Sequence, residues 1–358
     1  MNRRGLREGL LSPGVLAALV AAALFGGATP FAKHLLFTVD PWLLAGLLYA
    51  GSGIALTMLR VIRPLTRSPV TGQEWFYLSG SVISGGIIAP VLLMKGLLLM
   101  PASGASLLLN AEGVLTAVLA WFAFRENFDR RIALGMLAIA AAAMTLTWTP
   151  PLILNRLGPA LLILCACLAW ALDNNLTRKV ALLDATWLAW IKGLVAGTVN
   201  LLIALSLGAR WPASGVVAAA LLIGALGYGV SLVLFVVGLR DLGAARTSAY
   251  FSIAPFVGAL GGLIWLHEPV TIRLMIAGSL MALGVWLHLT EKHEHSHDHP
   301  VLQHDHEHVH DAHHQHVHDV RVAPGTRHRH VHRHDPLSHS HHHTPDAHHP
   351  HDHDSGVR

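Results

Sequence analysis

Histidine is concentrated at one end of this chain. Of its 27 histidines, 24 lie between residues 293 and 358, where they alternate with Asp, Glu, Ser, Val and Arg. Neutral imidazole is a good ligand for nickel, copper, zinc and cobalt. The H-x-H and HH spacings let a chain wrap several rings around one ion. Binding should weaken as the pH falls through the imidazole range, because protonated rings cannot coordinate a metal.

We therefore expect this tail to bind nickel, cobalt or zinc in loose, overlapping sites, with no cofactor required elsewhere. The candidate ligands are His293, His295, His297, His299, His304, His306, His308, His310, His313, His314, His316 and His318. With almost no apolar residues to bury, the tail is predicted to be disordered when it binds no metal. The alternative is a tail that only solvates the protein or acts as a pH-responsive polycation.

The chain before residue 291 is dominated by Leu, Ala, Val, Ile and Gly. Overall, 53% of the residues are hydrophobic, 13% are charged, and the mean hydropathy is +0.49. Because soluble proteins carry about 25% charged residues, this composition indicates a polytopic membrane protein whose partner is the lipid bilayer. Lys and Arg are scattered between apolar runs, so no nucleic-acid partner is expected. Nothing in the sequence indicates an oligomeric state.

Ten apolar segments are long enough to cross a bilayer, which needs about 20 residues in a helix. They cover residues 14–36, 41–59, 75–94, 103–124, 131–149, 158–179, 185–207, 214–239, 246–266 and 271–289. Lys and Arg gather in the loops of one side, which the positive-inside rule assigns to the cytoplasm. An even number of spans then predicts an inner-membrane protein with both termini, and hence the His-rich tail, in the cytoplasm.

The two halves of the apolar region resemble each other at a spacing of 142–146 residues. WFAFRENFDRR aligns with LIWLHEPVTIR, which pairs Glu126 with Glu268, and a second alignment pairs Lys33 with Lys179. Five spans per half is an odd number, so the halves must insert in opposite directions, as in many transporters. The predicted fold is an all-α membrane protein of ten helices in a 5+5 inverted repeat. Its domains are residues 1–150 and 151–290, followed by the tail, 291–358.

Interruptions at corresponding positions of inverted repeats indicate where a substrate binds. Glu112-Gly113 in the fourth span corresponds to Ala254-Pro255 in the ninth. In the third and eighth spans, Gly85, Gly86 and Pro90 correspond to Gly227, Tyr228 and Leu232. The alternative for any single glycine is that it only lets two helices pack closely.

Ionisable residues within predicted spans are functional candidates, because a buried charge is costly unless it is paired. In one interpretation Glu112 and Asp173 hold a cation or exchange protons against it, and Asn110 and Asn174 supply neutral oxygens. In the other, Lys192 forms an ion pair with one of these carboxylates and the Asn residues bond across helices. These five residues form the predicted substrate path.

With these features the sequence resembles the drug/metabolite transporter superfamily, EamA type, over about residues 14–290. The resemblance rests on the ten spans in two halves, the Gly-rich end of the first span, and the glutamates in FAFRENFDRR and IWLHEPVTIR. It implies secondary transport, often export, of amino acids, drugs, other metabolites or metal cations. The fourth span departs from the family pattern, because LLLNAEGVLTAV carries Glu112 where proline is common. Members with His-rich ends resemble nickel and cobalt resistance exporters.

The leading hypothesis is a secondary exporter of a divalent transition metal, nickel or cobalt before zinc, that works by alternating access. The alternative is an exporter of small organic metabolites or amino acids with a metal-sensing or metal-buffering tail. A third is a membrane-anchored metal sensor or store. No catalytic constellation is apparent in the sequence, so we do not expect an enzyme.

Overall fold

The computed structural model describes most of the apolar region and parts of the tail. The described residues are 13–62, 70–124, 130–147, 154–180, 184–242, 247, 250–289, 294–299, 302–308, 328–334 and 337–342. Residues up to Glu291 cluster in one compact unit, and Lys292–Pro345 cluster in a second. Each unit is described by itself below.

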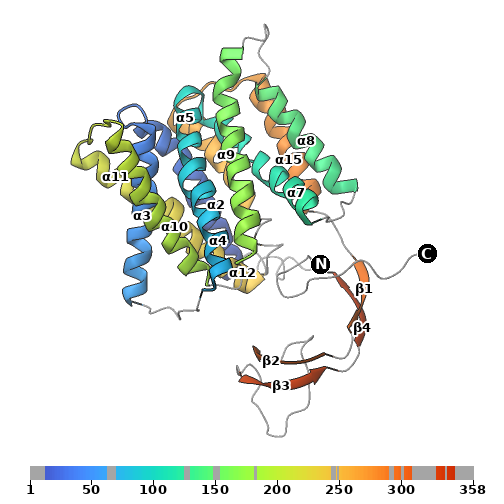
Figure 1. Ribbon diagram of the computed structural model, residues 1–358. Coiled ribbons are helices and arrows are strands. Elements are labelled where there is room, and N and C mark those ends of the chain that lie inside the picture. Colours follow the sequence, from blue (N-terminus) through green and yellow to red (C-terminus); the bar gives the residue numbers. More distant parts are fainter. Residues whose placement is uncertain are drawn as a thin grey trace. The chain divides into compact units, whose positions relative to one another are not determined.

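The first unit is helical over its described residues (Figure 1). Its helices in the first half of the chain are α2 (Pro13–Leu35), α3 (Pro41–Ile62), α4 (Gly72–Ser81), η1 (Val82–Ile88), α5 (Ala89–Leu99), α6 (Ala102–Leu108), α7 (Ala111–Phe124) and α8 (Arg130–Thr147). Those in the second half are α9 (Leu154–Arg178), α10 (Ala185–Ser206), α11 (Ser214–Gly224), η2 (Ala225–Val230), α12 (Ser231–Leu242), α14 (Ala254–Trp265) and α15 (Ile272–Leu289).

Among the described residues, six stretches of helix are long and apolar enough to cross a membrane. They are Pro13–Leu35, Pro41–Ile62, Gly72–Leu99, Leu157–Thr177, Thr186–Ser206 and Ser214–Gly238. Three shorter apolar helices cover Ala133–Thr147, Ala254–Trp265 and Ile272–Leu287. The prediction of a multi-pass helical membrane protein is therefore confirmed. The count of ten spans stays a prediction, because the fourth predicted span is divided between α6 and α7 and the shorter helices fall below the spanning length.

Polar side chains define where two of the helices begin. Thr71 and Glu74 form a capping box at the start of α4, in which the Glu74 carboxylate accepts from the Thr71 backbone N–H at 2.6 Å. The Asp184 carboxylate accepts from the Trp187 N–H at 2.8 Å and caps α10. Such caps satisfy backbone donors that a helix leaves unpaired in its first turn.

Irregular backbone occurs at corresponding places in the two halves. The π-helical turns η1 and η2 interrupt the third and eighth predicted spans and begin 143 residues apart, at Val82 and Ala225. A turn at Leu109–Asn110 separates α6 from α7, and a turn at Ser252–Ile253, again 143 residues later, precedes α14. The interruptions predicted at Gly85-Gly86 and Gly227-Tyr228 are therefore confirmed in the backbone.

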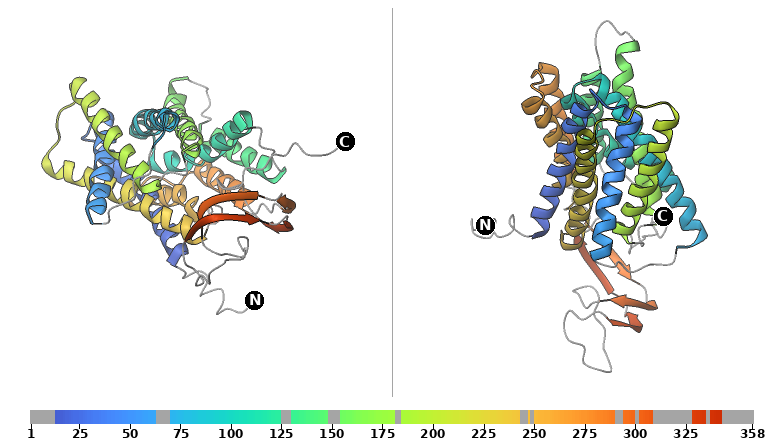
Figure 2. Two further views of the ribbon diagram at one scale, coloured as in Figure 1. Left: turned by 60° about the horizontal axis from the view of Figure 1, so that its bottom comes forward. Right: turned by 90° about the vertical axis from the view of Figure 1, so that its left-hand side faces the viewer.

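Helix packing follows the same pairing of halves (Figures 1 and 2). Helix α3 packs on α10 and α8 packs on α15, so the second and fifth predicted spans each contact their own counterparts. Helix α2 packs on α12, and the corresponding contact joins α9 to α5. These pairs agree with a twofold relation between the halves, whereas their opposite orientation in a membrane stays a prediction.

Close approach of α3 and α10 depends on small residues. A Cβ added to Gly53 would lie 2.9 Å from the Leu194 backbone N, and one added to Gly193 would lie 2.8 Å from the Gly53 backbone N. Small residues at such crossings let two helix backbones touch in a membrane protein, where lipid removes the hydrophobic drive between helices.

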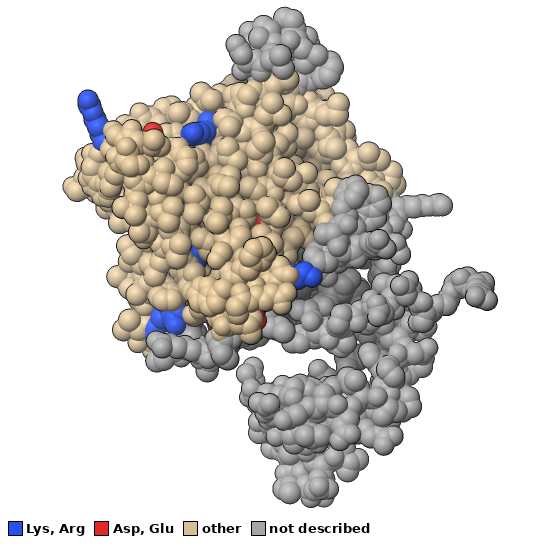
Figure 3. Space-filling model, viewed as in Figure 1, with Lys and Arg blue, Asp and Glu red and all other residues tan. Residues whose placement is uncertain are grey.

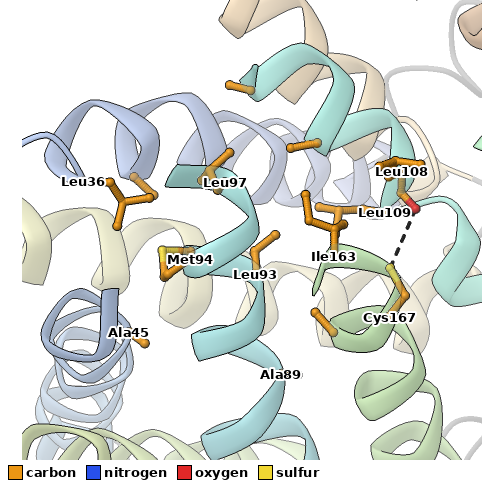
Figure 4. Packing of buried hydrophobic residues seen from close by; sticks show 14 of the residues in the cluster. Leu36, Ala45, Ala89, Leu93, Met94, Leu97, Leu108, Leu109, Ile163 and Cys167 are labelled. Atoms are coloured by element: carbon orange, nitrogen blue, oxygen red, sulfur yellow. Dashed lines mark hydrogen bonds between the residues drawn. The ribbon is translucent and has the colours of Figure 1, made fainter. Parts of the chain in front are cut away.

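The interior is packed with aliphatic side chains, and the surface is also apolar. Leu93, Met94 and Leu97 of α5 belong to the same buried cluster as Ile163 and Cys167 of α9, drawn in Figure 4. The exposed fraction of Val61 is 79% and that of Ile272 is 78%. On the face drawn in Figure 3, few Lys, Arg, Asp or Glu residues appear among the described atoms. Extensive exposed apolar surface is what a bilayer contacts.

The second unit contains strands. They are β1 (Glu294–His299), β2 (Leu302–His308), β3 (His328–His334) and β4 (Leu337–His342). Strand β1 pairs with β4, and β2 pairs with β3, both antiparallel. Disorder of the tail when it binds no metal stays a prediction.

Two adjacent glycines of α2 provide a test of the packing. A Cβ on Gly26 would overlap the backbone carbonyl of Ala254 in α14, whereas a Cβ on Gly27 would meet nothing within 4 Å. We expect Gly26→Ala to lower the melting temperature of the detergent-solubilised protein, because two backbones must separate. Gly27→Ala should leave it unchanged or raise it, since alanine favours a helix by about 1 kcal/mol over glycine. Equal effects of the two substitutions would contradict this packing.

Candidate substrate pathway

Two backbone carbonyls of η1 organise the centre of the first unit. Pro90 has no N–H to donate to the carbonyl of Gly86, four residues earlier. The amide of Asn200 in α10 donates to that carbonyl at 3.1 Å. The neighbouring carbonyl of Gly85 accepts from the Tyr49 hydroxyl at 2.9 Å and from the Trp170 indole at 3.0 Å. Side chains from α3, α9 and α10 thus converge on one irregular turn.

The Asp173 carboxylate lies against this turn and carries an ion pair. Its Oδ1 accepts from Lys192 Nζ at 2.6 Å, from Ser81 Oγ at 2.5 Å and from Thr177 Oγ1 at 2.9 Å. Asp173 is buried, with 8% exposed. A Cβ on Gly85 would overlap its carboxylate, so the glycine makes the room that the carboxylate occupies. Of the two interpretations, the ion pair with Lys192 is found for Asp173.

The Glu112 carboxylate has neutral hydrogen-bonding partners among its described contacts. Its Oε1 accepts from the Asn174 amide at 2.9 Å, and that amide also lies 3.3 Å from Thr116 Oγ1. Asn174 follows Asp173 directly in α9, so the amide that binds Glu112 is adjacent in sequence to the other carboxylate. Glu112 lies in the first turn of α7, beside the interruption at Leu109–Asn110. An irregular turn, an amide, a hydroxyl and a carboxylate are therefore brought together here.

Asn110 makes different contacts from the other four predicted residues. Its amide donates to the Leu107 carbonyl at 3.1 Å and lies 3.8 Å from Met281 Sδ in α15. Asn110 is buried and satisfies a carbonyl at the interruption between α6 and α7. The structure therefore brings Glu112 and Asn174 into one cluster and Asp173 and Lys192 into the adjoining one. It does not join Asn110 to either.

Aromatic rings adjoin the polar residues. Tyr49, whose hydroxyl binds the Gly85 carbonyl, has its ring centroid 5.6 Å from that of Tyr228 in η2. Tyr228 is 5.7 Å from Phe25, which in turn is 5.5 Å from Phe251. Both irregular turns, η1 and η2, therefore contact the same aromatic group, defined here as Phe25, Tyr49, Tyr228 and Phe251.

Charged residues near two helix ends have capping roles. The Glu268 carboxylate accepts from the backbone N–H groups of Ala102 and Ser103 at 2.5 and 2.8 Å, at the start of α6. Lys33 Nζ donates to the Leu97 and Leu98 carbonyls at 2.6 and 3.0 Å, at the end of α5. Opposite charges are favourable at these ends of a helix dipole. The alignment of the two halves had identified both residues, but the sequence did not predict their hydrogen-bonding partners.

The sequence did not indicate several residues of the two clusters. Ser81, Thr116 and Thr177 are common residue types in membrane helices, and Tyr49 and Trp170 lie in runs that read as ordinary apolar spans. A weak signal was available for Thr177, because it follows Asp173 by four residues and so shares its helix face. For the others, only the packing of separate helices identifies them.

The structure describes only half of the predicted metal ligands. Among residues whose side chains the structure describes, no three His, Cys, Asp or Glu gather where they could hold an ion. Of the twelve predicted tail ligands, His295, His297, His299, His304, His306 and His308 lie in β1 and β2. The other six, His293, His310, His313, His314, His316 and His318, lie outside the described residues. Metal binding by the tail therefore stays a prediction.

Removing one partner of the Asp173–Lys192 pair should destabilise the fold. Lys192→Met leaves the buried carboxylate without its cation, and breaking a buried pair in this way costs about 3–5 kcal/mol. We expect a marked fall in the melting temperature of the purified protein, and recovery of much of it in Lys192→Met/Asp173→Asn, which leaves no unpaired charge. Lys95→Met, at an exposed lysine, is the control. No recovery in the double variant would contradict the pairing.

Comparisons by sequence and by structure each match about three quarters of this chain to known proteins. The EamA-like transporter family model matches residues 12–148 and again residues 157–290. An uncharacterized transporter of Methanothermobacter thermautotrophicus (strain Delta H) is 26% identical over 292 residues, covering 76% of this chain and 85% of the archaeal protein. A solved structure, titled only as the crystal structure of a protein, superposes with a TM-score of 0.57 at 17% identity. That match covers 76% of this chain and 95% of the other, and at this identity the likeness concerns the fold alone.

Proposed function

Because this chain belongs to the EamA-like transporter family, we propose that it exports a divalent transition metal, nickel or cobalt before zinc. Transport is secondary and proceeds by alternating access between the two halves. The protein lies in the inner membrane with both termini in the cytoplasm, so the tail meets ions on the side from which they leave. The family and its archaeal relative support transport of a small substrate, and the features below support the choice of metal.

The observation that carries the proposal is the setting of Glu112. Its carboxylate is bound by the neutral amide of Asn174, with the Thr116 hydroxyl beside that amide. A carboxylate within a membrane helix is costly without a cation, which is why such groups mark ion pathways. Carboxylate, amide and hydroxyl oxygens are hard ligands that can bind a partly hydrated divalent cation without selecting nickel or cobalt, so the choice of metal rests on the histidine-rich tail. Proton exchange on the same carboxylate would couple export to the proton gradient.

The Asp173–Lys192 pair has a different part in this proposal. With Lys192 at 2.6 Å, Asp173 is already neutralised and is a weak cation ligand. Asn174, the next residue, binds Glu112, so any shift of α9 moves the amide and the ion pair together. We assign the pair to positioning Asn174 beside Glu112, and the cation itself to Glu112.

The tail supplies the second line of support. Its 24 histidines are suited to collecting borderline metals at cytoplasmic pH, at which most imidazoles are neutral. Many weak sites raise the local concentration of ions without trapping them.

One observation favours a second candidate, export of an amino acid or a related organic zwitterion. The aromatic group contacts both irregular turns, and its Tyr49 shares the Gly85 carbonyl with Trp170. Beside them, Asp173 and Lys192 offer one charge of each sign, which could exchange partners with an ammonium and a carboxylate. In that case the tail is a sensor or buffer for metal.

A single isosteric change separates the two candidates. Glu112→Gln keeps an acceptor oxygen for Asn174 but removes the charge. We expect cells producing this variant to retain at least ten times more nickel or cobalt than cells with the wild type, because losing a charged ligand costs more than about 1.4 kcal/mol, a factor of ten. Metal content is measured over time by elemental mass spectrometry at matched expression. Glu74→Gln, which preserves the capping box of α4, is the control carboxylate.

The outcomes are distinct. If Glu112→Gln and the wild type hold the same amounts of nickel, cobalt and zinc, metal export is wrong, and efflux of labelled amino acids is measured next with Lys192→Met/Asp173→Asn. A variant truncated after Thr290 tests whether the tail is needed for metal efflux. Persistent metal efflux without the tail would make the tail an accessory, whereas loss of efflux would make it part of the transport cycle.

A further inference from the structure

The end of α3 carries an arginine whose hydrogen-bonding capacity the described residues do not fill. The Arg60 guanidinium lies over the Trp190 ring of α10, 4.0 Å from the ring centroid. Its Nη1 atom is buried and has no hydrogen-bonding partner among the described residues. A charged donor that is withdrawn from water without an acceptor is costly. An acceptor supplied from outside the chain would remove this cost.

Trp190 holds the guanidinium in a defined position. Its indole N–H donates to Thr57 Oγ1 at 2.8 Å, and Thr57 Oγ1 in turn donates to the Gly53 carbonyl at 2.7 Å. An arginine stacked on an aromatic ring keeps its N–H groups in the guanidinium plane, where its edge can still bind an acceptor. The Arg60 side chain is half-buried, so part of that edge stays open to a ligand.

The end of α3 lies beside the start of α10. Along the contact between the two helices, Gly53 approaches Gly193 and Gly46 approaches Leu201, so the helices run in opposite directions. Arg60 is in the last turn of α3. The stack of Arg60 on α10 therefore joins a helix of the first half to a helix of the second half, close to one end of both.

Aromatic and apolar residues indicate that this end lies at a membrane interface. The ring centroid of Trp187, in the first turn of α10, is 6.2 Å from that of Trp75, in the first turn of α4. Tryptophan is enriched at the level of the lipid headgroups. Val61, which follows Arg60, is 79% exposed, as an apolar side chain in contact with lipid is. Arg60 is therefore positioned where headgroups and acyl chains meet.

We propose that Arg60, stacked on Trp190, binds the phosphate of an anionic phospholipid such as phosphatidylglycerol. The planar guanidinium fork matches phosphate oxygens bidentately. An anionic headgroup is favoured over a zwitterionic one, because a zwitterionic lipid carries its own ammonium group beside the phosphate. Its acyl chains can pack on the exposed apolar side chains around Arg60, which a free phosphate ion cannot do.

A bound lipid should stabilise the contact between α3 and α10. A ligand that binds the folded protein and not the unfolded chain raises the melting temperature, and here it does so by ordering a stack that spans the two halves. Lipid binding at this site is independent of the substrate that the helices move, so it can be measured on purified protein without any transport.

The test follows the melting temperature of the full-length protein in detergent while one additive is increased in concentration. The additives are phosphatidylglycerol, phosphatidylcholine of the same acyl chains, and inorganic phosphate. Arg60→Gln removes the guanidinium, and Arg60→Lys keeps a cation but removes the planar fork. Arg210→Gln is the matched control, because Arg210 is an exposed arginine between α10 and α11.

We expect phosphatidylglycerol to raise the melting temperature of the wild type and of Arg210→Gln at lower concentrations than phosphatidylcholine does. Arg60→Gln should need at least about ten times more phosphatidylglycerol for the same rise, because a hydrogen bond between two charged groups is lost. Arg60→Lys should lie between Arg60→Gln and the wild type, since an ammonium group attracts the phosphate but cannot bind it bidentately.

Three results would overturn the proposal. One is the same dependence on phosphatidylglycerol in the wild type and in Arg60→Gln. Another is a wild type that responds equally to inorganic phosphate, which would make the ligand a soluble anion. The third concerns Arg60→Lys, which decides by itself if Arg60→Gln does not fold: an unchanged response to phosphatidylglycerol in this variant would exclude binding through the guanidinium fork.

Discussion

The hydrogen bonds received by the Gly85 and Gly86 carbonyls hold the centre of the membrane helices together. In lipid there is no water to bind a carbonyl that a helix has released, so other side chains must do so. Tyr49, Trp170 and Asn200 meet this need from α3, α9 and α10. One irregular turn therefore specifies how three other helices approach it, and the missing Cβ of Gly85 leaves the space that the Asp173 carboxylate fills.

In this arrangement the carboxylates of Asp173 and Glu112 have different hydrogen-bonding partners. Asp173 sits in the tightly bonded cluster with Lys192, Ser81 and Thr177. Glu112 lies beside an interrupted helix and is bound by an amide. A buried ion pair is strongly disrupted when one partner is removed, whereas a carboxylate with neutral partners can gain or lose a cation without breaking a pair. The proposed function assigns a structural role to Asp173 and a transport role to Glu112.

In the proposed function, the membrane helices and the tail would bind metal ions through different ligands. Oxygen ligands in a membrane suit an ion that must leave again, and imidazoles suit capture from dilute solution at near-neutral pH. Under this proposal, substitutions in the tail and in the membrane helices should alter ion collection and ion transport separately.

The sequence by itself determined the features that depend on composition and period. The apolar runs, the repeat near 143 residues and the positions of η1 and η2 could be read from residue types, because Gly and Pro act on the local backbone and a bilayer demands long apolar helices. The glutamates and lysines of the spans were identifiable as costly charges. Histidine alternation likewise suggested metal chemistry.

Only the tertiary structure decided which of these residues meet. Lys192 could have paired with either carboxylate, and the chain folds so that it binds Asp173 and leaves Glu112 to Asn174. The roles of Ser81, Tyr49 and Trp170 depend on contacts between helices far apart in sequence, and so do the caps made by Lys33 and Glu268. The register of the tail strands is a long-range property of the same kind. Residue types state which interactions are possible, but distances between separate elements select among them.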